Sequence, residues 1–254
     1  STYGPNARAL DLDYAHKDAL DLGKALKSNA KSDLYWNVFD QPLTNAGATR
    51  RDIFRGLKDL TKRLQKNKAE ERAKDAERPQ NLIIFYFSGH GAEIDGDFYL
   101  LPHDVNARQD AIELTDKGIH VGRLRSEIAR LAKYGRVVVM LDACRSGNAT
   151  VAGSTLPVNA GRLHDALRGL DNVLIFTSSS GAGLSYESSD YQNGFFTEAV
   201  LRALTTQADN TGDGILDVTE FAGHLANGLR SISGNRQEIQ PDFRFVKPLF
   251  VVNR

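Results

Sequence analysis

Cysteine is almost absent from this sequence of 254 residues, which contains a single one, Cys144. One cysteine cannot form a disulfide within the chain, so the sequence does not belong to the small secreted scaffolds that disulfides hold together. A lone cysteine is either a small buried apolar residue or a reactive thiol. The residues around Cys144 must distinguish these two cases.

An excess of charge of either sign is also absent, because 32 Lys and Arg residues balance 32 Asp and Glu residues. This balance argues against a broad nucleic-acid surface and against binding to anionic membranes. No apolar run is long enough to cross a bilayer, since the longest, at residues 82–87 and 137–141, have the length of strands. With no signal peptide, we expect a cytoplasmic protein that binds neither nucleic acid nor membrane. The sequence begins with Ser rather than Met, and we expect it to be a trimmed segment.

The pattern of apolar residues predicts an α/β fold. Three runs that are apolar at nearly every position, at 82–87, 136–141 and 173–176, have the character of strands buried on both faces. Their alternation with amphipathic helices predicts a mostly parallel sheet covered by helices on both faces. We expect one helix that begins after a cap at Thr49, and others at 10–26, 121–131, 195–204 and 218–229. Further strands are expected at 34–39 and 243–252, and a hairpin turn at Asp95 and Gly96.

A histidine and the only cysteine follow two of these strands. His90 comes just after the strand at 82–87, and Cys144 comes just after the strand at 136–141. Sites in parallel α/β sheets form beyond the carboxyl ends of the strands. A neighbouring imidazole activates a thiol as a nucleophile, and the backbone N–H groups of Gly91 and Cys144 can form an oxyanion hole. Spacing alone leaves open that Cys144 is a structural core residue and His90 a turn residue.

The motifs around both residues resemble those of the caspase and metacaspase clan. FYFSGHG at 85–91 resembles the histidine motif, and VMLDACRSG at 139–147 resembles the cysteine motif. The order, with histidine about 50 residues before cysteine, also agrees. The resemblance spans nearly the whole chain and is closest to bacterial caspase-like proteases. Further matching segments lie at 12–19, 176–183, 194–198 and 236–241.

This resemblance implies one caspase-like peptidase domain over residues 1–254, folded as a three-layer sandwich. It makes His90 the general base and acid and Cys144 the nucleophile in the cleavage of a protein or peptide substrate, with no cofactor required for the chemistry. The family's first, central strand precedes the region of Tyr3 and is missing from this sequence. We therefore expect the natural protein to be longer, with additional domains or a regulatory partner.

The resemblance also implies a substrate pocket. The positions that match the acidic pocket of metacaspases are Asp18 and Asp142, and Ser88 matches a further pocket residue. Two carboxylates facing a guanidinium form charge-assisted hydrogen bonds, so we expect cleavage after Arg or Lys. In the simpler alternative, Asp18 is a solvated helix residue and Asp142 caps a loop. Cleavage after Asp, and an inactive or partner-gated interaction module, are the alternative functions.

Residues 209–220, with the sequence DNTGDGILDVTE, match the spacing of an EF-hand calcium loop. Oxygen-bearing side chains occupy loop positions 1, 3, 5, 9 and 12, with glycine at position 6. We expect residues 205–230 to be a helix–loop–helix insertion, with calcium as its candidate ion. The calcium ligands would be Asp209, Thr211, Asp213, Asp217 and Glu220. In the alternative, the segment is an Asp- and Gly-rich turn without metal, because EF-hands normally occur in pairs.

Overall fold

A four-stranded sheet forms the centre of the fold. The computed structural model describes residues 12–29, 35, 38–74, 81–105, 111–143, 160–179, 187–242 and 248–251. Strands β1 (Asn81–Ser88), β5 (Gly135–Asp142) and β6 (Val173–Ser179) run parallel, and β10 (Glu238–Asp242) pairs antiparallel with β6. The order in the sheet is β1-β5-β6-β10. The prediction of a mostly parallel central sheet is confirmed.

The central strands are apolar because both of their faces are covered. In β5, Val138 and Met140 belong to one core cluster, whereas Val139 and Leu141 belong to the other. All four side chains are fully buried. Successive residues of a strand point to opposite faces, so a strand covered on both faces is apolar at every position rather than at alternate ones.

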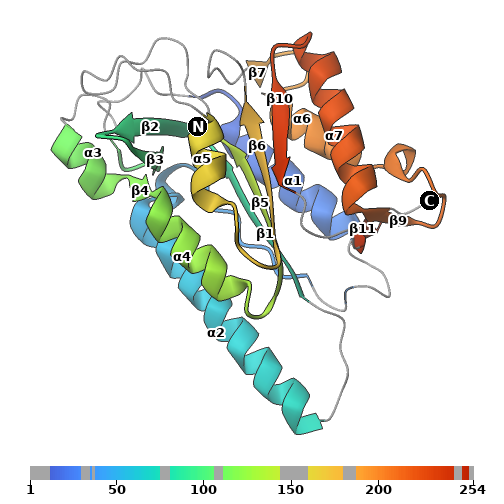
Figure 1. The fold of residues 1–254 in the computed structure, drawn as a ribbon, viewed down its shortest axis with the longest axis horizontal. Coiled ribbons are helices and arrows are strands. Elements are labelled where there is room, and N and C mark those ends of the chain that lie inside the picture. Colours follow the sequence, from blue (N-terminus) through green and yellow to red (C-terminus); the bar gives the residue numbers. More distant parts are fainter. Residues whose placement is uncertain are drawn as a thin grey trace.

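Helices cover both faces of the sheet and complete three layers (Figure 1). One layer contains α1 (Ala15–Asn29), α6 (Phe195–Ala203) and α7 (Val218–Ser233). The other contains α2 (Arg50–Lys74), α4 (Val121–Leu131) and α5 (Ala160–Leu167). This arrangement agrees with the expected caspase-like sandwich. Of the helices in the described ranges, none has the length and hydropathy needed to span a membrane.

A small antiparallel sheet extends from the end of β1. It contains β2 (His90–Ile94), β3 (Asp97–Leu101) and β4 (Ile119–His120), and α3 (Ala111–Lys117) precedes β4. The hairpin turn lies at Asp95 and Gly96, as the sequence predicts. Both residues have positive φ angles, 52° and 85°, which the tight two-residue turns of hairpins require. The hairpin pairs His90, at the start of β2, with Leu101 of β3.

The segment that contains the EF-like loop belongs to the main core. A 3₁₀ turn (Thr206–Ala208) and strand β9 (Ile215–Asp217) lead into α7, and β9 pairs with β11 (Pro248–Val251). Phe221 and Leu225 of α7 are fully buried beside Phe176 of β6. Residues 205–230 therefore supply side chains that the central sheet packs against.

Some elements differ from the sequence predictions. Helix α1 begins at Ala15 rather than at Leu10, because the backbone N–H groups of Asp13 and Tyr14 donate to the Glu187 carboxylate at 2.9 and 3.0 Å. Helices α3 and α5 and strand β10 were not predicted, since their sequences are short or polar. Of the strand expected at 34–39, only residues 35, 38 and 39 are described, and residues 38 and 39 are not in a strand. The strand expected at 243–252 is described only at Pro248–Val251, as β11.

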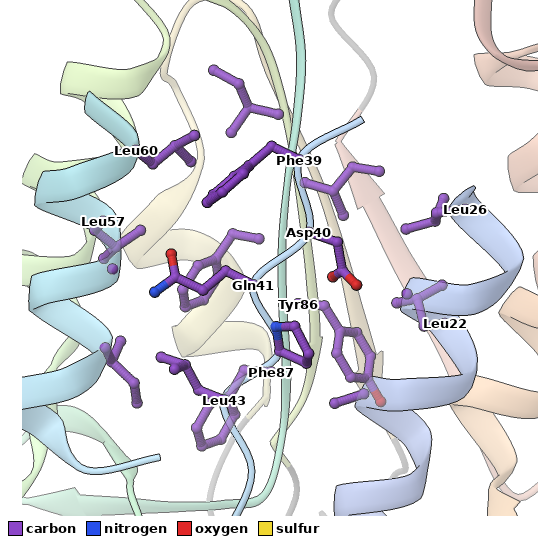
Figure 2. Close-up of a pocket in the computed structure, with 18 of the residues that line it drawn as sticks. Leu22, Leu26, Phe39, Asp40, Gln41, Leu43, Leu57, Leu60, Tyr86 and Phe87 are labelled. Carbon is purple, nitrogen blue, oxygen red and sulfur yellow. The ribbon is translucent and has the colours of Figure 1, made fainter. Parts of the chain in front are cut away.

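A groove of about 770 Å³ runs along the edge of β1 that faces away from β5. Figure 2 shows Leu22 and Leu26 of α1 on one side, Leu57 and Leu60 of α2 on the other, and the segment that contains Phe39 running between them. In the described part of the chain, no strand pairs with this edge of β1. The expectation of one more central strand remains a prediction.

Candidate active site

The ends of β1 and β5 meet at one edge of the central sheet. In their parallel register, Ser88 lies opposite Asp142, and the backbone N–H of Gly89 donates to the Asp142 carbonyl oxygen at 3.1 Å. His90 follows immediately as the first residue of β2 and is 3% exposed. The carboxyl ends of two adjacent parallel strands thus place a buried imidazole beside the chain that leads to Cys144.

Gly91 lies directly against that chain. An ideal Cβ on Gly91 would be 3.0 Å from the carbonyl oxygen of Ala143 and 2.5 Å from Cζ of Phe98. Only a residue without a side chain fits between them, so glycine at this position allows the His90 hairpin to approach β5. Cys144 follows Ala143 in the sequence but lies outside the described residues, and so does its part of the predicted oxyanion hole.

The three predicted pocket residues come together. The Ser88 hydroxyl donates to Oδ2 of Asp18 at 3.1 Å, and the backbone N–H of Gly194 donates to Oδ1 of Asp18 at 3.0 Å. Asp18 is 0% exposed and Asp142 is 3% exposed. An ideal Cβ on Gly194 would be 3.2 Å from Oδ2 of Asp18 and 3.1 Å from Oδ2 of Asp142. Both carboxylates therefore lie close to the same backbone position, Gly194.

This environment changes the acidity of Asp18. Burial in the protein, together with the nearby charge of Asp142, raises the pKa of Asp18 to about 7. The hydrogen bonds from Gly194 and Ser88 act in the opposite direction, but they are weaker. A carboxylate desolvated next to another carboxylate is costly unless a proton or a cation neutralises it. The pocket is thus suited to a positively charged group.

A buried tyrosine lies next to the pocket. The Tyr86 hydroxyl and the Thr197 hydroxyl form a hydrogen bond of 2.5 Å, which connects β1 to α6. Burial raises the pKa of Tyr86 well above its usual value, and the charges of Asp18 and Asp142 raise it further. Tyr86 therefore stays a neutral phenol. It also interacts with Ser88, the residue that donates to Asp18.

Sequence reasoning missed Gly194, Asn193 and Tyr86. The segment 194–198 was noted for its resemblance to the family, but no role followed from it. One signal was available in the sequence, because Gly194 directly precedes an apolar helix, where a close approach of backbone to another group is common. The contact with both acids depends on the tertiary fold and could not be derived from spacing.

The EF-like loop is closed by its own hydrogen bonds. Oδ1 of Asp209 accepts from the Gly212 and Asp213 amides at 2.7 and 3.2 Å, and Oδ2 accepts from the Gly214 amide at 2.8 Å. Asp217 caps α7 and forms a capping box with Glu220, whose other carboxylate oxygen accepts from the Thr211 amide at 3.0 Å.

These carboxylates do not converge on one point. Across the described residues, no group of three or more His, Cys, Asp or Glu side chains is arranged to hold a metal ion. Calcium binding by this loop remains a prediction.

Comparisons with known proteins address the fold and the family. Residues 3–245 match the sequence profile of a family described as the caspase domain. Among solved structures, a structural-genomics target from Geobacter sulfurreducens is similar over 96% of this chain and 91% of its own, with 16% sequence identity and a TM-score of 0.55. At this identity the likeness shows the fold alone. No curated protein matches the sequence significantly.

Proposed function

The chain belongs to the caspase-domain family, which is a family of cysteine peptidases, and we propose that it is an endopeptidase that cleaves after Arg or Lys. Cys144 is the proposed nucleophile, and His90 is the proposed general base and acid. The observation that carries this proposal is the pair of buried carboxylates, Asp18 and Asp142, at the same sheet edge as His90.

The charge of the pocket supports basic rather than acidic specificity. Asp18 and Asp142 are both buried and both lie close to Gly194. A guanidinium or ammonium group entering this space would gain charge-assisted hydrogen bonds and relieve the repulsion between the two carboxylates. An aspartate side chain would add a third negative charge to a desolvated site, which is strongly unfavourable. This argues against the alternative of cleavage after Asp.

The proposed reaction follows the general scheme of cysteine peptidases. The Cys144 thiol transfers its proton to His90, and the thiolate attacks the carbonyl carbon of the residue held in the pocket. The backbone N–H groups of Gly91 and Cys144 stabilise the oxyanion that forms. His90 then returns the proton to the leaving amine, and water hydrolyses the thioester to regenerate the thiol. No metal or cofactor is needed for these steps.

Fluorogenic peptides test the proposal. Three substrates that differ only in their last residue, Arg, Lys or Asp, are incubated with the protein with and without calcium. Cys144→Ala and His90→Gln are the control variants. We expect release of fluorophore from the Arg and Lys peptides, loss of that activity in both variants, and no cleavage of the Asp peptide.

Each outcome distinguishes among the candidate functions. Cleavage of only the Asp peptide would retain the Cys–His pair and overturn the basic pocket. Activity that persists in Cys144→Ala would overturn the dyad. If all three peptides remain intact while iodoacetamide still alkylates Cys144 rapidly, the partner-gated module becomes the better description, because a reactive thiolate would be present without access for substrate.

A further inference from the structure

Both pocket carboxylates lie close to Gly194, but the backbone conformation at this position does not require glycine. It ends β8 (Asn193–Gly194) and caps the N-terminus of α6. Its backbone angles are φ −63° and ψ 146°, an extended conformation that any residue adopts. It is buried. The lack of a side chain at this position therefore matters for space rather than for conformation.

The missing side chain lets both acids lie close to the backbone at Gly194. A Cβ at Gly194 would lie 3.1 Å from Oδ2 of Asp142 and 3.2 Å from Oδ2 of Asp18. Carbon and carboxylate oxygen rarely approach this closely, so a methyl group here would push both carboxylates out of their present positions. The backbone N–H of Gly194 meanwhile donates to Oδ1 of Asp18, and the Ser88 hydroxyl donates to Oδ2.

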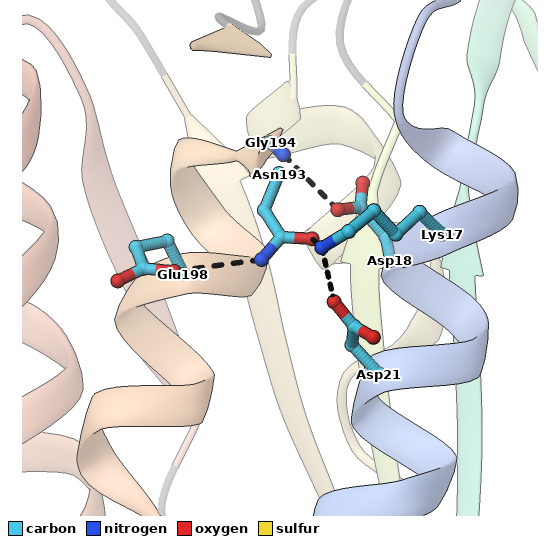
Figure 3. A network of polar contacts seen from close by, with 6 residues as sticks. All are labelled: Lys17, Asp18, Asp21, Asn193, Gly194 and Glu198. Atoms are coloured by element: carbon cyan, nitrogen blue, oxygen red, sulfur yellow. Dashed lines mark hydrogen bonds and ion pairs between the residues drawn. The ribbon is translucent and has the colours of Figure 1, made fainter. Parts of the chain in front are cut away.

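A network of polar contacts fixes Gly194 against α1 (Figure 3). The side-chain oxygen of Asn193 accepts from Nζ of Lys17 at 3.3 Å, and Lys17 also pairs with Asp21. The amide nitrogen of Asn193 donates to Glu198 of α6 at 3.5 Å. Because Lys17 is adjacent to Asp18 in sequence, this network holds the backbone of β8 in register with the pocket carboxylate.

A second connection holds the same strand from its other edge. Gly194 pairs with Glu187 of β7 (Glu187–Ser188), and the Glu187 carboxylate accepts the Asp13 and Tyr14 amides at the start of α1. The position of Gly194 relative to Asp18 is thus set on both sides. The fold thus holds the Gly194 backbone against the Asp18 carboxylate, and precise recognition of a planar group requires such support.

We propose that Gly194 is a specificity-determining residue, whose missing side chain allows the carboxylates of Asp18 and Asp142 to hold the positions in which both can bond to a guanidinium group. This inference rests on the proposed cleavage after basic residues. A planar guanidinium has a fixed fork of donors and needs both carboxylates in defined positions, whereas the ammonium of lysine has three rotatable donors and tolerates their displacement. Gly194 therefore favours Arg over Lys, and a methyl group at this position weakens binding of Arg more.

The test compares Gly194→Ala with the wild type on the Arg and Lys peptides. Loss of one charge-assisted hydrogen bond corresponds to about 10- to 100-fold, so kcat/KM for the Arg peptide falls by about that factor. The Arg-to-Lys ratio falls by about 10-fold. This ratio is measured within one preparation, so a reduced fraction of folded protein cancels. Gly223→Ala is the matched control, because no atom lies within 4 Å of the methyl group that it adds on α7.

Two further readouts separate failure of this inference from failure of the proposed function. Alkylation of Cys144 by iodoacetamide, which needs no pocket, stays within about twofold of the wild-type rate in Gly194→Ala. Methylguanidinium at millimolar concentration shifts the NMR signal of the residue-194 amide in the wild type, and this shift is lost in the variant.

Each result then decides one question. An unchanged Arg-to-Lys ratio in an active Gly194→Ala enzyme would overturn the role of Gly194 and leave the function intact. A wild type that binds methylguanidinium but cleaves neither basic peptide would overturn the function, and the loss of that binding in Gly194→Ala would still support the role of Gly194. If the wild type neither binds methylguanidinium nor cleaves either peptide, both are overturned.

Discussion

Asp18 and Asp142 face the same backbone position from two different elements. Asp18 lies in the first turn of α1, whereas Asp142 ends the central strand β5, and each has an oxygen close to the place of a Cβ on Gly194. Two carboxylates buried at one point do not stabilise a protein core, because their desolvation and their mutual repulsion are both unfavourable. The pair is therefore the strongest physical indication of a functional site in this fold.

Replacing Asp18 by asparagine is expected to stabilise the protein at alkaline pH. The pKa of Asp18 is raised from 3.8 to about 7 in the folded state, chiefly by burial. The folded protein then binds the proton more tightly than the unfolded chain, so stability decreases as pH rises from about 4 through 7. The penalty is complete above pH 7 and absent below pH 4. The Asp18→Asn variant carries no such penalty, because its amide does not ionise.

Thermal unfolding of both proteins between pH 4 and pH 9 measures this effect. At pH 4 the two unfolding temperatures should be most nearly alike, since a protonated Asp resembles Asn, and the difference should grow steadily from there to about pH 7. At pH 8.5 the variant should unfold several degrees higher, at about 2–4 °C for each kcal/mol in a domain of this size. A constant difference across the range would show that Asp18 does not titrate in this interval.

Removing one pocket charge should reduce cleavage after Arg without affecting the thiol. Asp142→Asn keeps the shape of the side chain but removes a charge from the pocket. We expect kcat/KM for the Arg peptide to fall by about 10- to 100-fold, the value of a charge-assisted hydrogen bond. The effect should lie mostly in KM if the bond is equally strong in the bound substrate and the transition state. Asp59→Asn, on the exposed surface of α2, is the matched control and should leave both constants unchanged.

The loop at residues 209–220 should keep its fold without metal. Its carboxylates already satisfy backbone amides, and Asp217 and Glu220 form a complete capping box. We therefore expect the unfolding temperature of Cys144→Ala to agree within about 1 °C in EDTA and in millimolar calcium. A rise of several degrees in calcium, absent in a Cys144→Ala/Glu220→Gln double variant, would instead establish that the loop binds calcium.

The outer edge of β1, with which no strand of the described ranges pairs, should be visible in amide exchange. Alternate residues of a strand direct their N–H groups to opposite edges, and β5 pairs with one edge only. Within residues 82–87, we expect every second amide to exchange at least about 100-fold more slowly than its neighbours, because only that set bonds to β5. The fully paired strand β5 is the internal reference. Uniform protection along β1 would mean that another strand occupies the groove.

Much of this fold could be predicted because a strand buried on both faces has a recognisable local sequence. The run at 82–87 and the run at 136–141 are apolar at nearly every position, and Asp95 and Gly96 have the composition of a hairpin turn. Strand β10 was missed because it has polar and proline residues, which are tolerated at the edge of a sheet. Its assignment depends on pairing with β6, which local sequence does not encode.

The residues of the candidate site could also be predicted only in part from local sequence. His90 and Ser88 could be placed at the end of β1 by strand position alone, whereas the selection of Asp18 from α1 depended on resemblance to a family. Gly194 was missed because its contribution is a close approach of two carboxylates to its backbone, and such an approach has no signature in composition or periodicity. Its role follows only from the distances between elements remote in sequence.

The groove beside β1 also has a consequence for how the protein behaves in concentrated solution. Among the described residues no strand pairs with the outer edge of β1, and an unpaired edge of an apolar strand is a template for any extended chain, including the same strand of another molecule. Two such edges can join into one continuous sheet, and further molecules add by strand exchange. Where this edge stays unpaired, the tendency to assemble rises with protein concentration.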